Sequence, residues 1–133
     1  MACDRYPRRL AEVPAAAERV IVDATEPLPF AHKFERILVD APCSGTGTLA
    51  RNPEIKWRLQ PGELAAFPIR QKKMVERALE HLQPGGRLVY STCSLENEEN
   101  ENVVAGLNVL ETRMRLPGHD AGDGFFAAVI TLS

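Results

Sequence analysis

Three compact apolar runs, each closed by chemically reactive residues, constrain the fold of this 133-residue chain most strongly. They are RVIVDA at residues 19–24, ERILVDA at residues 35–41 and RLVYSTCS at residues 87–94. Short apolar runs rich in β-branched residues indicate buried strands. A long helix is predicted over residues 63–82, where apolar side chains recur every three or four positions, and Pro68 is expected to kink or restart it.

Shorter elements occupy the rest of the chain. Residues 8–13 and 95–107 are predicted to be helical, and residues 51–62 form a surface loop or a short helix. Two last strands, at residues 112–116 and 125–132, flank the turn-rich segment PGHDAGDG and indicate an antiparallel hairpin. Alternation of apolar strands with helices is typical of an α/β protein with a parallel sheet covered on both faces. Ligands of such sheets bind beyond the carboxyl ends of the strands, so the residues after the three apolar strands are expected to meet at one edge.

Composition excludes several classes of protein. The chain is 44% hydrophobic and 26% charged with a formal net charge of −2, so its overall charge does not indicate a nucleic-acid partner. No apolar run approaches the ~18 residues of a membrane span, and the N-terminus lacks the apolar core of a signal peptide. The three cysteines form no C-x-x-C pair. We therefore expect a cytoplasmic protein with free thiols, without a metal site or a disulfide framework.

The loop DAPCSGTGTLA, residues 40–50, allows two interpretations. Its glycines match a G-x-G-x-x-A dinucleotide loop, which would make the chain a nucleotide-binding oxidoreductase. That fingerprint needs a glycine directly at the strand end and a helix starting at its last position. Here four residues intervene and Pro53 would cut such a helix short. We favour a tight turn in which Gly45 and Gly47 adopt positive φ.

In the second interpretation of this loop, its cysteine takes part in a reaction. Cys43 and Cys93 each follow an apolar strand and each precede a serine. Free cysteines are usually small buried hydrophobes, and acids at strand ends such as Asp40 and Asp23 often cap turns, so both interpretations stay open. Two thiols at neighbouring strand ends favour chemistry. The helix predicted after Cys93 would lower its pKa and the glutamates in that helix would raise it, so no net direction follows.

A basic segment follows the thiol loop. Residues 51–77 contain seven basic and three acidic residues, a net charge of +4, and the only tryptophan. Basic residues beside an aromatic ring suit a phosphate backbone and a stacked base. A solvated helix face with a packed tryptophan accounts for the same pattern. The candidate nucleic-acid contacts are Arg51, Lys56, Trp57 and Arg58.

The motifs DAPCSGTG, RNPEIKWR, QPGGRLVYSTCSLENEEN and GDGFFAA closely resemble the Sun/Fmu-type RNA cytosine-5 methyltransferases, over Cys3 to Ala128. The resemblance implies a Rossmann-like methyltransferase sheet, mostly parallel and closed by a C-terminal antiparallel hairpin. It implies S-adenosylmethionine as the cofactor and a cytosine in ribosomal or transfer RNA as the methyl acceptor. The implied reaction passes through a covalent bond between a cysteine and carbon 6 of cytosine.

Each site residue takes its role from this resemblance. Cys93 corresponds to the nucleophile, and Cys43 to the second thiol, which helps to release the product. Asp40 corresponds to the acid that faces the target base, and Pro42 shapes the turn. The implied cofactor contacts are Asp4 at the ribose hydroxyls and Asp23 near the adenine, with Asp40 and Pro42 beside the reacting group.

The chain also departs from the family pattern. The family's glycine-rich cofactor loop belongs ahead of Asp4, where this sequence has no such segment, and Val129 replaces a basic residue after GDGFFAA. We therefore expect residues 1–133 to form a partial catalytic domain whose N-terminal strands are missing. An exposed apolar sheet edge would favour self-association. Such a fragment can be inactive alone, and the alternative is a non-catalytic RNA-binding or dimerising module derived from the same fold.

Overall fold

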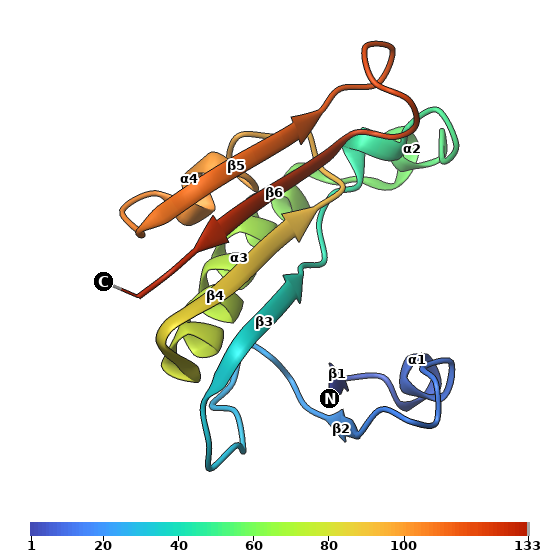
Figure 1. Ribbon diagram of the computed structural model, residues 1–133. Helices are drawn as coiled ribbons and strands as arrows, with labels where there is room; N and C mark the ends of the chain where they lie inside the picture. Colours follow the sequence, from blue (N-terminus) through green and yellow to red (C-terminus); the bar gives the residue numbers. More distant parts are fainter. Residues whose placement is uncertain (133) are drawn as a thin grey trace.

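The computed structural model describes residues 1–132 as an α/β fold with two sheets (Figure 1). The larger sheet has the strand order β3-β4-β6-β5, and the smaller pairs β1 with β2. The strands are β1 (Ala2–Asp4), β2 (Arg19–Ile21), β3 (Phe34–Asp40), β4 (Leu82–Thr92), β5 (Val109–Arg115) and β6 (Phe125–Ile130). The helices are α1 (Pro7–Ala11), the 3-10 turn η1 (Thr46–Thr48), α2 (Ile55–Arg58), α3 (Pro61–Glu80) and α4 (Glu101–Val104).

Strand pairing confirms most of the predicted sheet. β3 and β4 are parallel, whereas β6 runs antiparallel to both β4 and β5, which is the predicted C-terminal hairpin. The prediction that all three apolar runs share one sheet is wrong, because β2 pairs with β1 and not with β3. An apolar run indicates a strand but does not choose its partner, and β2 forms its ladder with Ala2–Asp4.

One face of the larger sheet carries the core. α3 contributes Val75 and Ala78, α4 contributes Val103 and Val104, and these pack against the central strands β4 and β6. The fully buried side chains of those strands include Leu88, Tyr90, Phe126 and Ile130. Burying such side chains is the main stabilising contribution to a fold of this size. This face therefore fixes the positions of β3 and β4.

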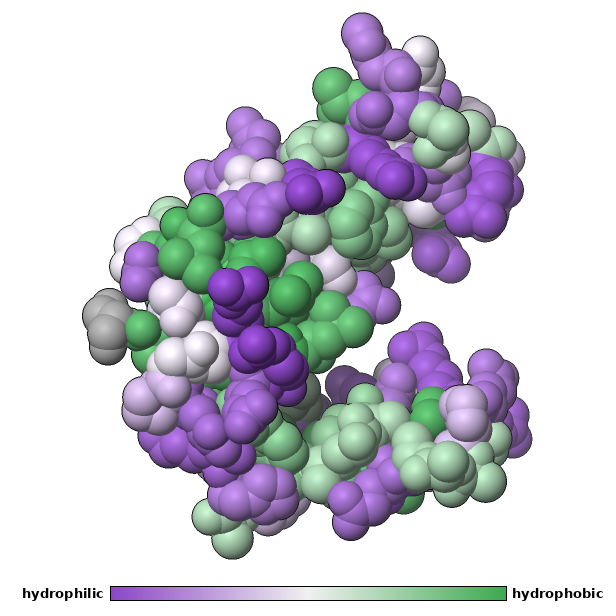
Figure 2. All heavy atoms as spheres, in the orientation of Figure 1, coloured by the Kyte–Doolittle hydropathy of each residue, from purple (hydrophilic) through white to green (hydrophobic). Residues whose placement is uncertain are grey.

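The opposite face of the sheet is uncovered in the described part of the chain. The predicted cover on both faces is therefore wrong there, since α3 and α4 contribute to the same core cluster. Strand alternation places Leu38, Val89 and Val129 on the open face. Leu38 is 69% exposed. Figure 2 shows apolar surface over this part of the sheet.

Helix α3 begins and ends close to the predicted bounds. Pro61 occupies its first turn, and the Glu63 carboxylate accepts a hydrogen bond from the backbone N–H of Gln60 at 3.2 Å. Pro68 lies inside the continuous helix, so it does not restart it as expected. The missing N–H of Pro68 removes one backbone hydrogen bond, and packing of α3 on the sheet compensates for that loss.

The helix predicted over residues 95–107 is reduced to α4, Glu101–Val104. Polar side chains ahead of α4 bond to the preceding loop instead. Asn100 donates to the backbone carbonyl of Ser94 at 2.9 Å and accepts from the Thr92 hydroxyl at 2.6 Å. Side-chain bonds of this kind compete with helix formation, which explains why the segment after Cys93 forms turns.

Candidate active site

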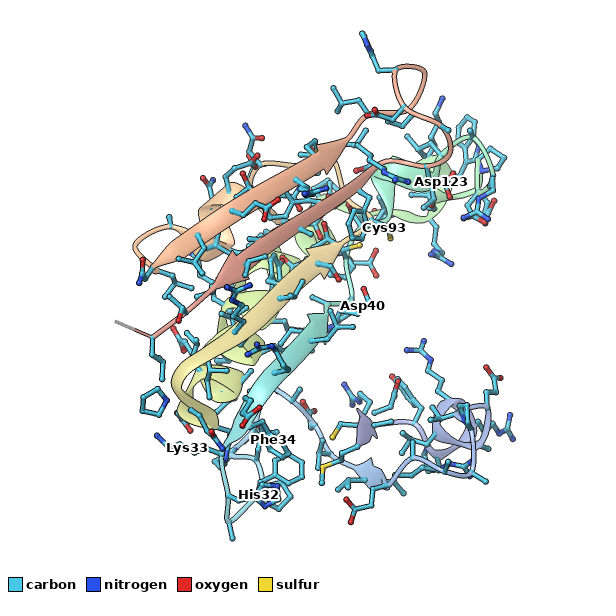
Figure 3. All side chains as sticks on the ribbon, in the orientation of Figure 1. His32, Lys33, Phe34, Asp40, Cys93 and Asp123 are labelled. Atoms are coloured by element: carbon cyan, nitrogen blue, oxygen red, sulfur yellow. The ribbon has the colours of Figure 1, made fainter. Side chains whose placement is uncertain are left out.

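The two candidate thiols lie at the carboxyl ends of neighbouring parallel strands. β3 ends at Asp40 and β4 ends at Thr92, so Cys43 and Cys93 each follow a strand by one to three residues. Their Sγ atoms are 3.2 Å apart, in hydrogen-bond contact. Figure 3 shows Asp40 and Cys93 side by side at these strand ends. The parallel register of β3 and β4 therefore brings together two cysteines separated by fifty positions.

The glycines of the thiol loop have two different functions. Gly45 has a φ of 75°, so the prediction of a left-handed turn residue is correct there. The same prediction for Gly47 is wrong, because its φ is not positive. Gly47 is required by close packing, since a Cβ added to it would lie 2.5 Å from the Gly124 carbonyl oxygen and 2.7 Å from that of Cys93. Its N–H donates to the Cys93 carbonyl at 2.9 Å, which ties the two loops together.

Contact between the thiols separates their pKa values. The Cys43 thiol donates to the Cys93 sulfur, which lowers the pKa of Cys93 to about 7, against the opposing effects of burial and of the charges on Asp40 and Glu99. The same contact, followed by burial, raises the pKa of Cys43. The expected helix after Cys93 does not begin until Glu101, so the helix dipole is not the cause. Cys93 is therefore the thiol of the pair that ionises first, and near pH 7 about half of its molecules carry the thiolate while Cys43 keeps its proton.

A cavity of about 410 Å³ opens in front of the thiols. It is lined by Cys43 and Cys93, by Asp40 at the end of β3, by Asp4 at the end of β1, and by Asp23, which follows β2. Figure 2 shows the surface hollowed between the N-terminal segment and the rest of the molecule. The residues that follow the apolar strands thus meet around one cavity, as predicted, although β2 belongs to the smaller sheet.

Hydrogen bonds hold the three acids of this cavity in place. Asp40 accepts a hydrogen bond from the Ser91 hydroxyl at 3.2 Å. Asp4 accepts from the backbone N–H of Tyr6 at 2.8 Å. Asp23 accepts from the Thr25 hydroxyl at 2.7 Å and from the Thr25 N–H at 3.0 Å, and these bonds hold the pKa of Asp23 below its usual value. Both N-terminal acids are therefore oriented hydrogen-bond acceptors beside the cavity.

The candidate nucleic-acid contacts lie outside the cavity. Lys56, Trp57 and Arg58 are exposed on the short helix α2, and Trp57 is 86% exposed. Trp57 is therefore not packed into the core, which removes the alternative of a buried tryptophan. Arg51 precedes α2 and forms an ion pair with Asp123, in the loop ahead of β6. Figure 3 shows Asp123 at the same end of the sheet as Cys93.

Sequence reasoning missed several residues of the cavity wall. Tyr6 and Arg9 line it from the segment after β1, and Arg70 and Met74 line it from α3. Arg70 and Met74 are four positions apart, so they share one face of the helix. That spacing was visible in the sequence, but nothing in it placed this face of α3 beside the thiols.

The described residues 1–132 contain neither a membrane-spanning helix nor a cluster of metal ligands. No helix in this range is long and apolar enough to cross a membrane. No group of three or more histidine, cysteine or acidic side chains in this range is arranged to hold a metal ion.

Curated relatives share the sequence over most of this chain. A small-subunit rRNA methyltransferase B from Klebsiella pneumoniae is 39% identical over 110 residues, which cover 72% of this chain and 26% of the relative. The protein of the same name from Vibrio cholerae is 34% identical over 142 aligned positions, which cover 96% of this chain and 33% of the relative. The chain thus spans about a quarter to a third of the length of these relatives.

A solved structure shares the fold. NSun6 from Pyrococcus horikoshii, determined with SFG, superposes with a TM-score of 0.75 at 28% identity, over 86% of this chain and 34% of that one. The family model for the 16S rRNA methyltransferases RsmB/F matches residues 1–115. The thiol pair at the ends of β3 and β4 lies within that match. By sequence and by fold, the chain belongs to the RsmB/F family of 16S rRNA methyltransferases.

Proposed function

We propose that residues 1–133 are part of the catalytic domain of an S-adenosylmethionine-dependent RNA cytosine-5 methyltransferase, and that they supply its two catalytic thiols. The observation that carries the proposal is the 3.2 Å contact between Cys43 and Cys93 at the wall of the cavity. Curated relatives named for rRNA methylation support RNA as the substrate. The NSun6 structure with SFG, an S-adenosylmethionine analogue, supports the cofactor.

The cavity residues fit that cofactor. A volume of about 410 Å³ lies within the usual range of small-molecule sites, roughly 300–1,000 Å³. Carboxylates accept hydrogen bonds from hydroxyl and amino groups, so Asp4 suits the ribose hydroxyls and Asp23 the adenine end. Pro42 and Asp40 line the same cavity beside the thiols. When bound, the cofactor supplies an electrophilic methyl group to carbon 5 of the cytosine.

Cys93 makes that carbon reactive. Carbon 5 of cytosine is a poor nucleophile until a sulfur adds at carbon 6, which leaves carbon 5 enamine-like. Addition requires the thiolate, and the pKa of about 7 at Cys93 supplies it at neutral pH. The new carbon–sulfur bond neutralises the Cys93 charge. This is covalent catalysis, which divides a difficult substitution into easier steps.

Cys43 is suited to the second half of the reaction. Its raised pKa is caused first by the bond to the Cys93 sulfur. Once Cys93 is bonded to carbon 6, that cause disappears, so Cys43 can lose its own proton to water in the cavity and then, as a thiolate, accept the proton from carbon 5. The electron pair of the carbon–hydrogen bond restores the ring double bond, and Cys93 leaves as a thiolate. Asp40 lines the cavity beside both thiols, and its carboxylate can accept a hydrogen bond from the amino group of the base.

The test traps the covalent intermediate. RNA containing 5-fluorocytosine has no carbon 5 proton to lose, so the adduct formed with S-adenosylmethionine cannot decompose. We expect the chain to form a denaturant-resistant complex with this RNA, Cys93→Ala to abolish it and Cys43→Ala to keep it. A complex that requires Cys43 alone reverses the two roles. RNA binding without a complex from any variant supports the non-catalytic RNA-binding module instead.

We also propose that α2 contacts the RNA. Trp57 is 86% exposed between Lys56 and Arg58, so a base can stack on its ring while the cations meet phosphates. Trp57→Ala is expected to weaken RNA binding about tenfold, a loss within the range reported for one stacked base, as measured by filter binding. Leu110→Ala, at another exposed apolar side chain, is the matched control and should bind RNA normally. Equal affinities for both variants would exclude α2 from the interface.

A further inference from the structure

The two thiol loops meet through a second pair of side chains. Each cysteine precedes a serine, and the hydroxyls of Ser44 and Ser94 lie 3.2 Å apart, as the thiols of Cys43 and Cys93 do. Ser94 donates its proton to Glu99, so Ser44 is the donor of the pair of hydroxyls. The two Cys-Ser pairs, Cys43-Ser44 and Cys93-Ser94, therefore pack with thiol against thiol and hydroxyl against hydroxyl.

The carboxylate of Glu99 bonds to both the Cys43 loop and the Cys93 loop. Its Oε2 atom accepts from the backbone N–H of Ser44 at 2.9 Å, and its Oε1 atom accepts from the Ser94 hydroxyl at 2.8 Å. Its backbone carbonyl accepts from the Tyr90 hydroxyl at 2.5 Å. One carboxylate thus contacts the residue that follows each cysteine.

Gln71 completes the arrangement from α3. Its amide nitrogen donates to Glu99 Oε2 at 2.9 Å and to the Pro42 carbonyl at 3.0 Å. Cys43 is therefore held on both sides, through Pro42 before it and Ser44 after it. Gln71 is fully buried, and α3 is anchored in the core by Val75.

Burial shows that Glu99 is not an ordinary surface acid. It is 1% exposed, and within residues 1–132 its carboxylate forms no salt bridge. A buried carboxylate without a counter-charge is unfavourable unless hydrogen bonds satisfy its oxygens. Its three donors come from three separate segments: the Cys43 loop, the Cys93 loop and α3. An acceptor-only group is suited to bond such donors together.

We propose that Glu99 is a positioning residue that holds the Cys43 and Cys93 thiols in contact by bonding to the serines that follow them. The catalytic meaning of that contact rests on the proposed function, whereas the positioning itself is measured on the free thiols. Glu99 reaches no part of the cavity that the thiols line. It therefore acts on the reaction only through Cys43 and Cys93.

Two substitutions separate the geometry of Glu99 from its charge. Glu99→Gln preserves the shape, because the amide oxygen accepts from Ser44 and Gln71 while the amide nitrogen donates to the Ser94 oxygen. Glu99→Ala removes all three bonds. The groups that act on the Cys93 charge are Cys43, Asp40 and Glu99, and Arg70 of α3 lines the same cavity.

Thiol spacing is measured with phenylarsine oxide, in which arsenic bonds to two adjacent sulfurs with loss of one water. The full chain and Glu99→Gln are expected to bind it equally, and Glu99→Ala at least about tenfold more weakly, since the effective concentration of the second thiol falls. The exposed neighbour variant Glu98→Ala is the matched control and should bind it like the unaltered chain. Tight binding by a folded Glu99→Ala variant would overturn the proposal.

The pH profile of Cys93 alkylation gives the second readout. Glu99→Gln removes a charge that raises the Cys93 pKa, so the midpoint should move down. Glu99→Ala separates Cys93 from the Cys43 donor, so the midpoint should move up. If Glu99 only stabilised the fold, the two substitutions would lower the stability of the chain but would not move the Cys93 midpoint in opposite directions. If Glu99→Ala does not fold, Ser94→Ala removes one of the three bonds and should weaken arsenical binding, whereas unchanged binding would count against positioning.

Discussion

At the scale of single residues, the site depends on an asymmetry between two chemically identical side chains. Cys43 and Cys93 both follow apolar strands, and both precede a serine. Their sequence contexts could identify the pair but could not assign the charge. The assignment comes from the contact itself, because the thiol of Cys43 stabilises a thiolate on Cys93. A donor fifty positions away is invisible to any local pattern.

Alkylation by iodoacetamide tests this asymmetry, since only the thiolate reacts. Cys93 should reach half-maximal reactivity near pH 7. Cys43→Ala removes the cause that lowers the Cys93 pKa, so the midpoint should rise, and each unit of rise slows alkylation at neutral pH about tenfold. Cys3 is the internal control, because burial raises its pKa. An unchanged Cys93 midpoint in Cys43→Ala, read by mass spectrometry of the modified peptides, would contradict the assignment.

At the scale of elements, the sequence predicted β3, β4 and the β5–β6 hairpin because apolar alternation and turn residues are local signals. It did not predict the short α4, because the Asn100 side chain bonds to Thr92 and Ser94 in the preceding loop instead of allowing a longer helix. It also placed β2 in the wrong sheet, since pairing depends on Ala2–Asp4. The close packing of Gly47 against Gly124 was likewise hidden, because the two are far apart in the chain.

Gly47→Ala tests the packing of the thiol loop against the loop ahead of β6. The added methyl group would overlap the carbonyl oxygens of Gly124 and Cys93, so the free energy of unfolding should fall by about 1–3 kcal/mol. Gly62→Ala is the matched control: its Cβ meets nothing within 4 Å, and alanine in a helix should be neutral or stabilising by up to about 1 kcal/mol. Urea denaturation measures both, and equal stability of the two variants would exclude the close contact.

At the scale of the whole molecule, the two edges of the larger sheet differ. β5 at one edge carries Glu111, Arg113 and Arg115, just as β3 carries Glu35, Arg36 and Asp40, and charged side chains discourage pairing with another strand at either edge. β3 at the other edge exposes Leu38, next to the apolar face that no described helix covers. We propose that copies of the chain associate through the β3 edge.

Light scattering as a function of concentration measures this association. Leu38→Lys should weaken it at least about tenfold, because a charge in the middle of an edge strand opposes pairing. Ile69→Lys is the matched control, since Ile69 is 63% exposed but lies on α3, away from the edge. Equal effects of the two lysines would point to general hydrophobic association, and a monomeric unaltered chain would remove the proposal.

If Cys93 is the nucleophile of the thiol pair, Cys93 is the residue that becomes attached to RNA, and the site of attachment can be measured. The chain is incubated with S-adenosylmethionine and 5-fluorocytosine RNA, and the trapped complex is digested and sequenced by mass spectrometry. The modified nucleotide is expected on the peptide containing Cys93, with Cys43 unmodified. Attachment to Cys43, or RNA bound without attachment to either cysteine, would contradict it.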